Sequence, residues 1–171
     1  MTRGEFLIEP FSSAAHERDA FACGNQALDE YIRRYASQDV KRRVSLVFVA
    51  SWPGERVVRG YYSLSAASFQ KEDLPRELAR KLPHYPVPAA IIGRLAVDRS
   101  CQGKGLGAQL LMDCFDRVVQ ASEIMAVYAI VADAKDEAAK AFYTRYGFAS
   151  FVDQPLRLFI PMATVRQLWG K

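Results

Sequence analysis

The sequence predicts a single α/β domain, residues 1–171, with a mixed, twisted sheet flanked by helices. Its composition, half apolar and a quarter charged, is that of one ordinary globular domain. Apolar runs at residues 89–98 and 124–132 enclose a helical pattern, which is typical of a parallel strand, helix, strand unit. Residues 44–50 and the run from Val57 flank the turn sequence Trp-Pro-Gly-Glu, which predicts an antiparallel hairpin.

The segment before this hairpin reads as a short strand followed by a helix. We expect the strand at residues 6–9, and Asn25 is a predicted N-cap for the helix. The apolar positions of that helix recur at helical spacing: Leu28, Ile32, Tyr35 and Ala36. We therefore expect Arg33 and Arg34 to point away from the apolar face.

The second half begins with an ordered excursion and continues with the parallel unit. Residues 71–88 carry four prolines around a short helix expected near 76–81. The strand at 89–98 is apolar enough to lie centrally in the sheet. A helix is expected from Leu106, and Asp133 is the expected cap of a later helix that Gly147 ends. Closing strands follow, with an interruption expected at Pro155.

Several classes of protein do not fit the sequence. No apolar run approaches the roughly 20 residues of a membrane helix, and the first residues do not resemble a secretory signal. We expect a cytoplasmic protein without a membrane partner. Three cysteines without a CxxC pair and two histidines do not assemble a zinc pattern, so no metal site is expected.

Positive charge is concentrated in residues 31–43. The segment holds five basic residues against Asp39, which equals the chain's net charge of +4. The basic residues are Arg33, Arg34, Lys41, Arg42 and Arg43. Such a run is typical either of a solvated helix face or of a surface that binds nucleic-acid phosphates. Both interpretations stay open at this point.

A glycine-rich turn joins the apolar strand to the helix at Leu106. Helix starts carry unpaired N–H groups, and glycines allow a phosphate to approach them. A P-loop would need Ser or Thr after Lys104, where the chain has Gly105. Gly103, Gly105 and Ala108 satisfy a dinucleotide fingerprint, but Glu123 precedes the next strand instead of ending it. Two interpretations of the turn remain: a plain connection without a ligand, and a third phosphate-binding pattern.

That third pattern is [QR]xxGx[GA], filled by Gln102, Gly105 and Gly107, and with it the chain resembles the GNAT acetyltransferase superfamily. The strand RLAVD and the sequence AKDEAAKAFYTRYGF extend the resemblance. It implies a GNAT fold whose parallel pair splays around acetyl-coenzyme A, the cosubstrate. It also implies these cofactor-binding residues: Leu95, Ala96, Val97, Gln102, Gly103, Lys104, Gly105, Leu106, Gly107 and Phe142. Backbone N–H groups of the RLAV strand would stabilise the oxyanion.

The same resemblance makes Tyr143 the expected general acid, which would protonate the leaving thiolate. The alternative is that Tyr143 only packs within an aromatic group on its helix. No carboxylate stands out as a general base. An α-amine titrates at about 7.7 to 8.0, so a useful fraction is neutral without one.

The upstream sequences FACGNQALDEYIRRYASQD, GYYSLSA and LPHYPVP narrow the resemblance to GNAT-type toxins of bacterial toxin–antitoxin modules. This resemblance implies acetylation of the α-amino group of aminoacyl-tRNA, which blocks translation. It further implies a ribbon-helix-helix antitoxin, a toxin homodimer, and contact with DNA only through the antitoxin. The expected tRNA-binding residues are Arg33, Arg34, Lys41, Arg42, Arg43, Arg80 and Lys81.

Two other functions remain open from the sequence. One is a GNAT enzyme that acetylates a protein N-terminus or a small amine. The other is a non-catalytic module that binds coenzyme A and serves as the partner of a DNA-binding repressor. Neither the accepted amino acid nor the tRNA species can be read from the residues.

Overall fold

The computed structural model describes residues 5–170, and it confirms the α/β class with a mixed sheet. Seven strands are ordered β1-β2-β3-β4-β5-β7-β6. Strand β4 (Val87–Val97) is the fourth of the seven, so its predicted central position is confirmed. It pairs in parallel with β5 (Ala129–Asp133) over Ala89–Ile92. The contacts divide into two compact units, residues 5–65 with 93–114 and residues 66–92 with 115–170.

The first unit contains the predicted hairpin and the helical segment before it. Its elements are β1 (Leu7–Pro10), α1 (Gln26–Glu30), η1 (Tyr31–Tyr35), α2 (Ala36–Arg42), β2 (Leu46–Ser51), most of β3 (Gly60–Phe69), the end of β4, η3 (Arg99–Cys101) and the start of α4 (Leu106–Ala121). Strands β2 and β3 pair in antiparallel register from Leu46–Leu64 to Ala50–Gly60. The Asn25 cap is confirmed, because its side chain accepts the Leu28 N–H.

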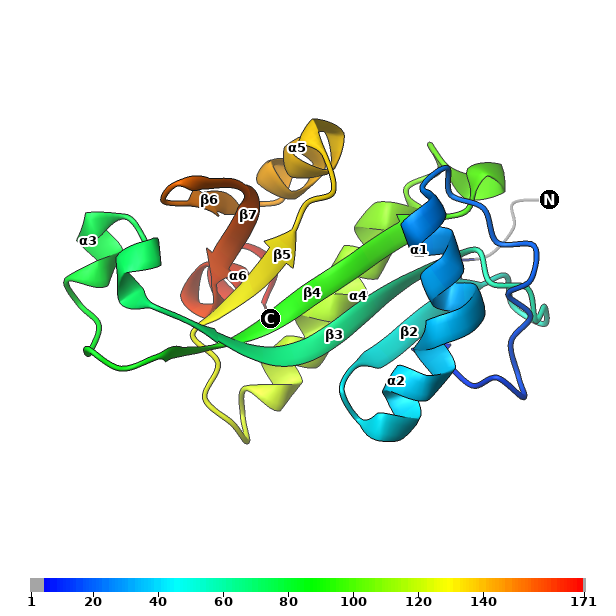
Figure 1. Cartoon of the computed structure of the whole chain (residues 1–171), viewed down its shortest axis with the longest axis horizontal. Coiled ribbons are helices and arrows are strands. Elements are labelled where there is room, and N and C mark those ends of the chain that lie inside the picture. Colours follow the sequence, from blue (N-terminus) through cyan, green and yellow to red (C-terminus); the bar gives the residue numbers. More distant parts are fainter. Residues whose placement is uncertain (1–4, 171) are drawn as a thin grey trace. The chain divides into compact units, whose positions relative to one another are not determined.

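The helices of this unit lie along β2 and β3 (Figure 1). Ile32 and Ala36 are fully buried against Val49 and Tyr61. The Tyr61 hydroxyl donates to the Leu28 carbonyl at 2.6 Å, so the buried phenol keeps a polar partner. Burying an isoleucine side chain such as that of Ile32 contributes about 1.5–3 kcal/mol. Apolar burial therefore holds the helical segment on the strands.

A π-helical turn, η1, interrupts this segment, and one expectation about it is wrong. Tyr35 was expected on the apolar face, but its side chain is 51% exposed. The π turn inserts an extra residue and so rotates Tyr35 away from the face on which Ile32 and Ala36 lie. Arg33, which was expected like Arg34 to point away from the apolar face, is half-buried, and its guanidinium donates to the Phe21 carbonyl.

The second unit contains the proline-rich excursion and the C-terminal elements. They are η2 (Lys71–Asp73), α3 (Arg76–Ala79), the start of β4, the end of α4, β5, α5 (Glu137–Arg145), β6 (Ala149–Phe151), β7 (Gln154–Pro161) and α6 (Met162–Trp169). Helices α5 and α6 both contact β7. Three phenylalanines form the aromatic core of this unit: Phe69, Phe151 and Phe159. The expected helix near 76–81 is confirmed in shorter form as α3.

Three expectations in this unit are wrong in detail, and one helix was not expected. The strand expected at 124–132 begins only at Ala129, and Ile124 is 89% exposed in the preceding loop. Asp136 caps α5, because its side chain accepts the Ala139 N–H, whereas Asp133 ends β5. The break between the last strands falls at residues 152–153, where Asp153 has φ +60°, and Pro155 lies within β7. Helix α6 was not predicted. The helix end at Gly147 is confirmed by its φ of +103°.

The described residues 5–170 hold neither a membrane-spanning helix nor a metal-binding cluster. No helix in this range is both long and apolar enough to cross a bilayer. Nor does the range contain a cluster of three or more His, Cys, Asp or Glu side chains suited to a metal ion. Cys23, Cys101 and Cys114 are buried and free.

Gly60 permits a close contact between β3 and α4. A Cβ at this position would meet Leu106 Cδ2 at 3.0 Å, Leu110 Cδ1 at 3.1 Å and the Ala96 carbonyl oxygen at 3.3 Å. We expect Gly60→Ala to lower the free energy of unfolding by about 1–3 kcal/mol, because the added methyl group would overpack the core. Urea denaturation measures this loss. Gly54→Asn is the control, since a Cβ there meets nothing within 4 Å and Asn tolerates its φ of +81°; equal losses in both variants would refute the close contact.

Candidate functional site

The glycine turn before α4 adopts a backbone that side chains rarely accept. Gly103 and Gly105 have φ values of +76° and +81°, in the left-handed region where an L-residue is strained. No heavy atom lies within 4 Å of the place where a Cβ would stand at either position. The glycines are therefore needed for conformation, and the space above them is open to a ligand.

The start of α4 offers a group of unpaired donors. The first backbone bond into the helix runs from the Gln109 N–H to the Gly105 carbonyl, at 3.2 Å. Within residues 5–170, the N–H groups of residues 103–108 have no backbone acceptor. The helix dipole adds a partial positive charge at the same end. This turn has the features of an anion site, which a diphosphate fits.

Two predicted contact residues have different roles in the turn. The Gln102 side-chain amide donates to the carbonyls of Cys23 and Val97, at 2.9 and 3.0 Å. Its nitrogen therefore ties the turn to the end of β4 and is not available to a cofactor. Leu106 is 1% exposed, so only its main chain is open to a ligand. Lys104 is exposed and Gly107 is half-buried.

Asp98 is a second anchor of the turn, and sequence reasoning did not assign it a role. Its carboxylate accepts the N–H of Ala22 at 2.9 Å. It also accepts the N–H and hydroxyl of Ser100, at 3.1 and 2.5 Å. Burial raises the pKa of the Asp98 carboxyl, but the hydrogen bonds from Ser100 and Ala22 outweigh it and hold that pKa below its usual value. A charged Asp98 thus fixes the residues that lead into the turn.

The end of β4 carries the RLAV residues that were predicted to contact the cofactor. Ala96 is buried, whereas Leu95 and Val97 are half-buried. Arg94, immediately before them, places its guanidinium carbon 3.6 Å from the centre of the Tyr31 ring. This cation–π contact joins β4 to the π turn within the first unit.

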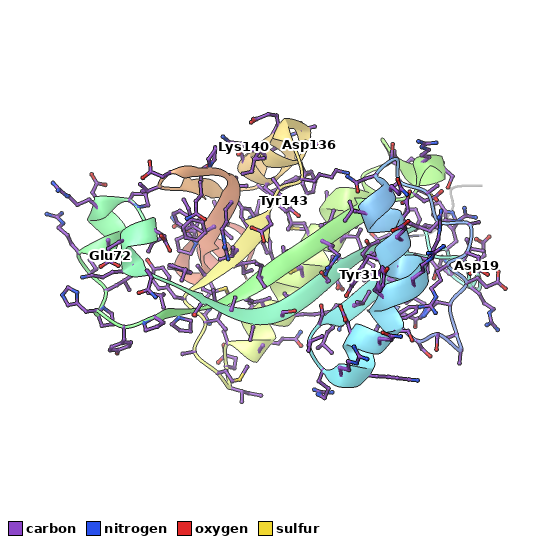
Figure 2. All side chains as sticks on the ribbon, in the orientation of Figure 1. Asp19, Tyr31, Glu72, Asp136, Lys140 and Tyr143 are labelled. Atoms are coloured by element: carbon purple, nitrogen blue, oxygen red, sulfur yellow. The ribbon has the colours of Figure 1, made fainter. Side chains whose placement is uncertain are left out.

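Tyr143 lies on α5 in the second unit, with only 4% of its surface exposed. Its ring centre is 5.3 Å from that of Phe142 and 5.2 Å from that of Phe148. Its carbonyl accepts the N–H groups of Tyr146 and Phe148, which form the helix end. In Figure 2, Tyr143 lies on the inner side of α5, while Asp136 and Lys140 lie on its outer side. The aromatic group therefore holds this phenol in one orientation. Phe142 is half-buried.

The predicted tRNA-binding residues are divided between the units. Arg34, Lys41, Arg42 and Arg43 are exposed along η1 and α2, whereas Arg33 is half-buried on the Phe21 carbonyl. Arg43 has φ +59° and closes α2 as its left-handed C-cap. Arg80 and Lys81 are exposed beyond α3 in the second unit.

Comparison with known families decides between the candidate interpretations of the turn. Residues 14–148 match the acetyltransferase (GNAT) family. The chain belongs to this family. The dinucleotide and P-loop interpretations are thereby set aside, and the expected GNAT fold and acetyltransferase class are confirmed.

Curated relatives of the chain are toxins. It is 38% identical to a protein of Mycobacterium tuberculosis named tRNA-acetylating toxin, over 92% of this chain and 93% of the relative. It is 31% identical to a protein of Sinorhizobium fredii named probable toxin TacT, over 96% and 95% of the two chains. The resemblance to GNAT-type toxins is therefore confirmed.

Solved structures of related toxins share the fold. AtaT complexed with acetyl-methionyl-tRNAfMet is 28% identical with a TM-score of 0.89, over 96% of this chain and 99% of that chain. AtaTR bound with AcCoA is 27% identical with a TM-score of 0.82, over 95% and 97%. The AtaT–AtaR complex with bound DNA is 26% identical with a TM-score of 0.77, over 95% and 98%.

Replacing the Asp98 carboxylate tests the anchor. We expect Asp98→Ala to lower the free energy of unfolding at pH 7 by about 2 kcal/mol, because hydrogen bonds to a charged acceptor are lost. The folded-state pKa lies below the unfolded one, so this stabilisation is present above about pH 4 and is lost as the pH falls through the folded-state pKa. Urea denaturation of wild type and variant across pH 3–7 should show curves that converge in acid.

Asp116→Ala, at an exposed position of α4, is the control for the general effect of removing a carboxylate. A constant difference between wild type and Asp98→Ala at all pH values would contradict the charged anchor.

Proposed function

We propose that this protein transfers an acetyl group from acetyl-coenzyme A to the α-amino group of aminoacyl-tRNA, and so acts as a translation-inhibiting toxin. The observation that carries the proposal is the glycine turn with its open, unpaired N–H groups in a chain of the acetyltransferase family. The proposed acceptor follows from the relative named tRNA-acetylating toxin and from AtaT complexed with acetyl-methionyl-tRNAfMet.

Acetyl-coenzyme A fits the residues of the turn. Its pyrophosphate is an anion that the N–H groups of Gly103, Lys104, Gly105 and Gly107 would hold, with the Lys104 ammonium nearby. The open space over Gly103 and Gly105 leaves room for the phosphate oxygens. The main chain of Leu95–Val97 would hold the pantetheine arm and polarise the thioester carbonyl. AtaTR, which shares this fold, has been solved bound with AcCoA, and this supports acetyl-coenzyme A as the ligand.

The chemistry is an acyl transfer between a thioester and an amine. The amine nitrogen attacks the thioester carbonyl carbon, a C–N bond forms and the C–S bond breaks. Coenzyme A leaves as a thiolate that takes a proton, and the amide nitrogen loses one. We assign protonation of the thiolate to the Tyr143 hydroxyl, because a phenol held by packed rings is fixed in orientation. Phe142 would border the same ligand.

The acceptor amine needs little help from a base. An α-amine titrates at about 7.7 to 8.0, against about 10.4 for a lysine side chain. A substantial fraction of the α-amine is therefore already neutral near pH 7.5. A site without an assigned general base therefore favours aminoacyl α-amines over lysine side chains.

The exposed cations supply affinity for RNA. Arg34, Lys41, Arg42 and Arg43 are free to meet phosphates in the first unit, with Arg80 and Lys81 in the second. Four phosphate contacts with single-stranded RNA give a log–log salt slope of about −2.8, from −0.7 for each contact. Phosphate contacts carry no sequence information, so they hold the RNA without selecting it.

The proposal extends to partners and place of action. The whole chain, residues 1–171, acts as one acetyltransferase domain in a cytoplasmic homodimer. A ribbon-helix-helix antitoxin inhibits it, and the pair reaches DNA through the antitoxin. The AtaT–AtaR complex with bound DNA supports the existence of such an assembly for this fold.

The acceptor is tested with labelled acetyl-coenzyme A and total tRNA, charged in one reaction and deacylated in the other. We expect label to enter only the charged tRNA, because only aminoacylated ends carry an α-amine. Gel filtration and scintillation counting measure it. Equal label in both reactions, or label that enters only added peptides or small amines, would refute the proposed acceptor.

Tyr143→Phe tests the general acid. Removing the hydroxyl while keeping the ring should lower kcat by about 10²–10⁴-fold, the usual contribution of a positioned acid. Calorimetry should show unchanged binding of acetyl-coenzyme A. Tyr146→Phe is the matched control on the same helix end, and its kcat should remain near wild type. Undiminished turnover in Tyr143→Phe would remove this residue from the mechanism.

A further inference from the structure

The helix that carries the basic segment has one exposed face, which we call the RNA strip. Between residues 34 and 42, the exposed side chains are Arg34, Tyr35, Gln38, Lys41 and Arg42. Their spacing of i, i+1, i+4, i+7 and i+8 places them on one side of a helix. The residues on the opposite side, Ile32 and Ala36, are fully buried. The strip is thus a continuous surface.

The charge of the RNA strip is of one sign. It holds three cations and no carboxylate. The nearby acids are engaged elsewhere: Asp39 accepts the Tyr31 hydroxyl at 2.9 Å, and Glu30 accepts the Gln26 amide at 3.2 Å. With three cations and no carboxylate among its exposed side chains, the strip attracts an anionic polymer.

Tyr35 stands out among the tyrosines of the first unit. Tyr31, Tyr61 and Tyr62 are each at most 4% exposed, and their hydroxyls donate to Asp39, the Leu28 carbonyl and Asp113. Tyr35 is 51% exposed because the π turn rotates it onto the strip. Single π turns are frequent at functional sites. Here the turn exposes a flat ring on the helix that also exposes Arg34 and Arg42.

A hollow of about 190 Å³ adjoins the strip at Lys41. Three serines, Ser12, Ser13 and Ser37, line it together with Lys41, over a floor that includes Phe11 and Val40. Hydroxyl groups and an ammonium are donors that suit a phosphate oxygen. Arg18 is a further cation near this hollow, since its guanidinium carbon lies 4.8 Å from the ring centre of Phe11, one of the lining residues.

We propose that the RNA strip binds an unpaired segment of the acceptor RNA, with one base stacked on Tyr35 and an adjoining phosphate seated between Lys41 and the serine hydroxyls. The inference rests on the proposed function and goes beyond it in naming the contacts. Stacking on an exposed aromatic ring is how proteins hold unpaired bases without reading them, because every base has a π face. A paired duplex presents no such base, so Tyr35 discriminates unpaired from paired RNA.

The test measures the Kd of the full-length protein for a fluorescein-labelled single-stranded 12-nucleotide RNA and for a blunt duplex of the same sequence, by anisotropy at several salt concentrations. We expect Tyr35→Ala to raise the Kd for the single strand about tenfold with an unchanged salt slope, because stacking is not ionic. The Kd for the duplex should hardly change. Tyr35→Phe should retain most of the affinity, since it keeps the ring.

Lys41→Ala should behave differently, with a salt slope that is smaller in magnitude by about 0.7 for single-stranded RNA. Ser37→Ala should weaken binding without changing that slope. Val44→Ala, at an exposed apolar position just beyond the strip, is the control for truncation and should leave the Kd unchanged. Acetyl-coenzyme A binding should be the same in all variants.

Three results would overturn the inference: an unchanged single-strand Kd in Tyr35→Ala, an equal loss for strand and duplex, or Tyr35-dependent binding of poly-glutamate instead of RNA. The last would assign the strip to an acidic protein partner. None of these results decides whether charged tRNA is acetylated. Acetylation that fails in the wild type while the Tyr35-dependent RNA binding persists would refute the proposed function alone.

Discussion

The unpaired N–H groups at the start of α4 are the constraint on which the rest of the site depends. A helix must leave its first amides without backbone partners, and they are useful only where an anion can reach them. Here Gly103 and Gly105 keep the approach open. A single contact between an anion and the helix dipole contributes only about 0.3–1 kcal/mol. If the turn were flexible in the free protein, the free energy needed to order it would offset this small gain. Asp98 and Gln102 meet that need by binding its flanking backbone to residues 22–23 and 97.

These anchors explain why polar residues of a binding motif need not touch the ligand. The Gln102 side chain lies in the motif that suggested a phosphate site, yet its amide nitrogen is occupied by two carbonyls. The charge of Asp98 has a similar role, since a carboxylate with three donors fixes backbone more strongly than a neutral group. Binding energy from the ligand is then not spent on ordering the loop.

Features fixed by local patterns could be predicted from the sequence, whereas features decided by register or by distant partners could not. The apolar runs placed β4 and the hairpin, Asn25 marked a helix start, and the glycines marked the turn before α4. The π turn was missed because apolar spacing assumes 3.6 residues per turn, so Tyr35 was assigned to the wrong face. Asp98 was missed because its partner Ala22 is 76 residues away. Periodicity extended β5 too early because Ile124 and Met125 are apolar but exposed.

The exposure of Tyr35, which the apolar spacing did not predict, bears on function. An exposed aromatic ring and an interrupted hydrogen-bond ladder are both costs to folding, and both occur at Tyr35, whereas Ile32 and Ala36 are fully buried. Arg33 pairs with the Phe21 carbonyl in the same turn, so the interruption is built into the packing of the first unit. Local departures of this kind are expected where function opposes stability. The fold therefore leaves the Tyr35 ring exposed on the cationic strip, although burial of that ring would stabilise the protein.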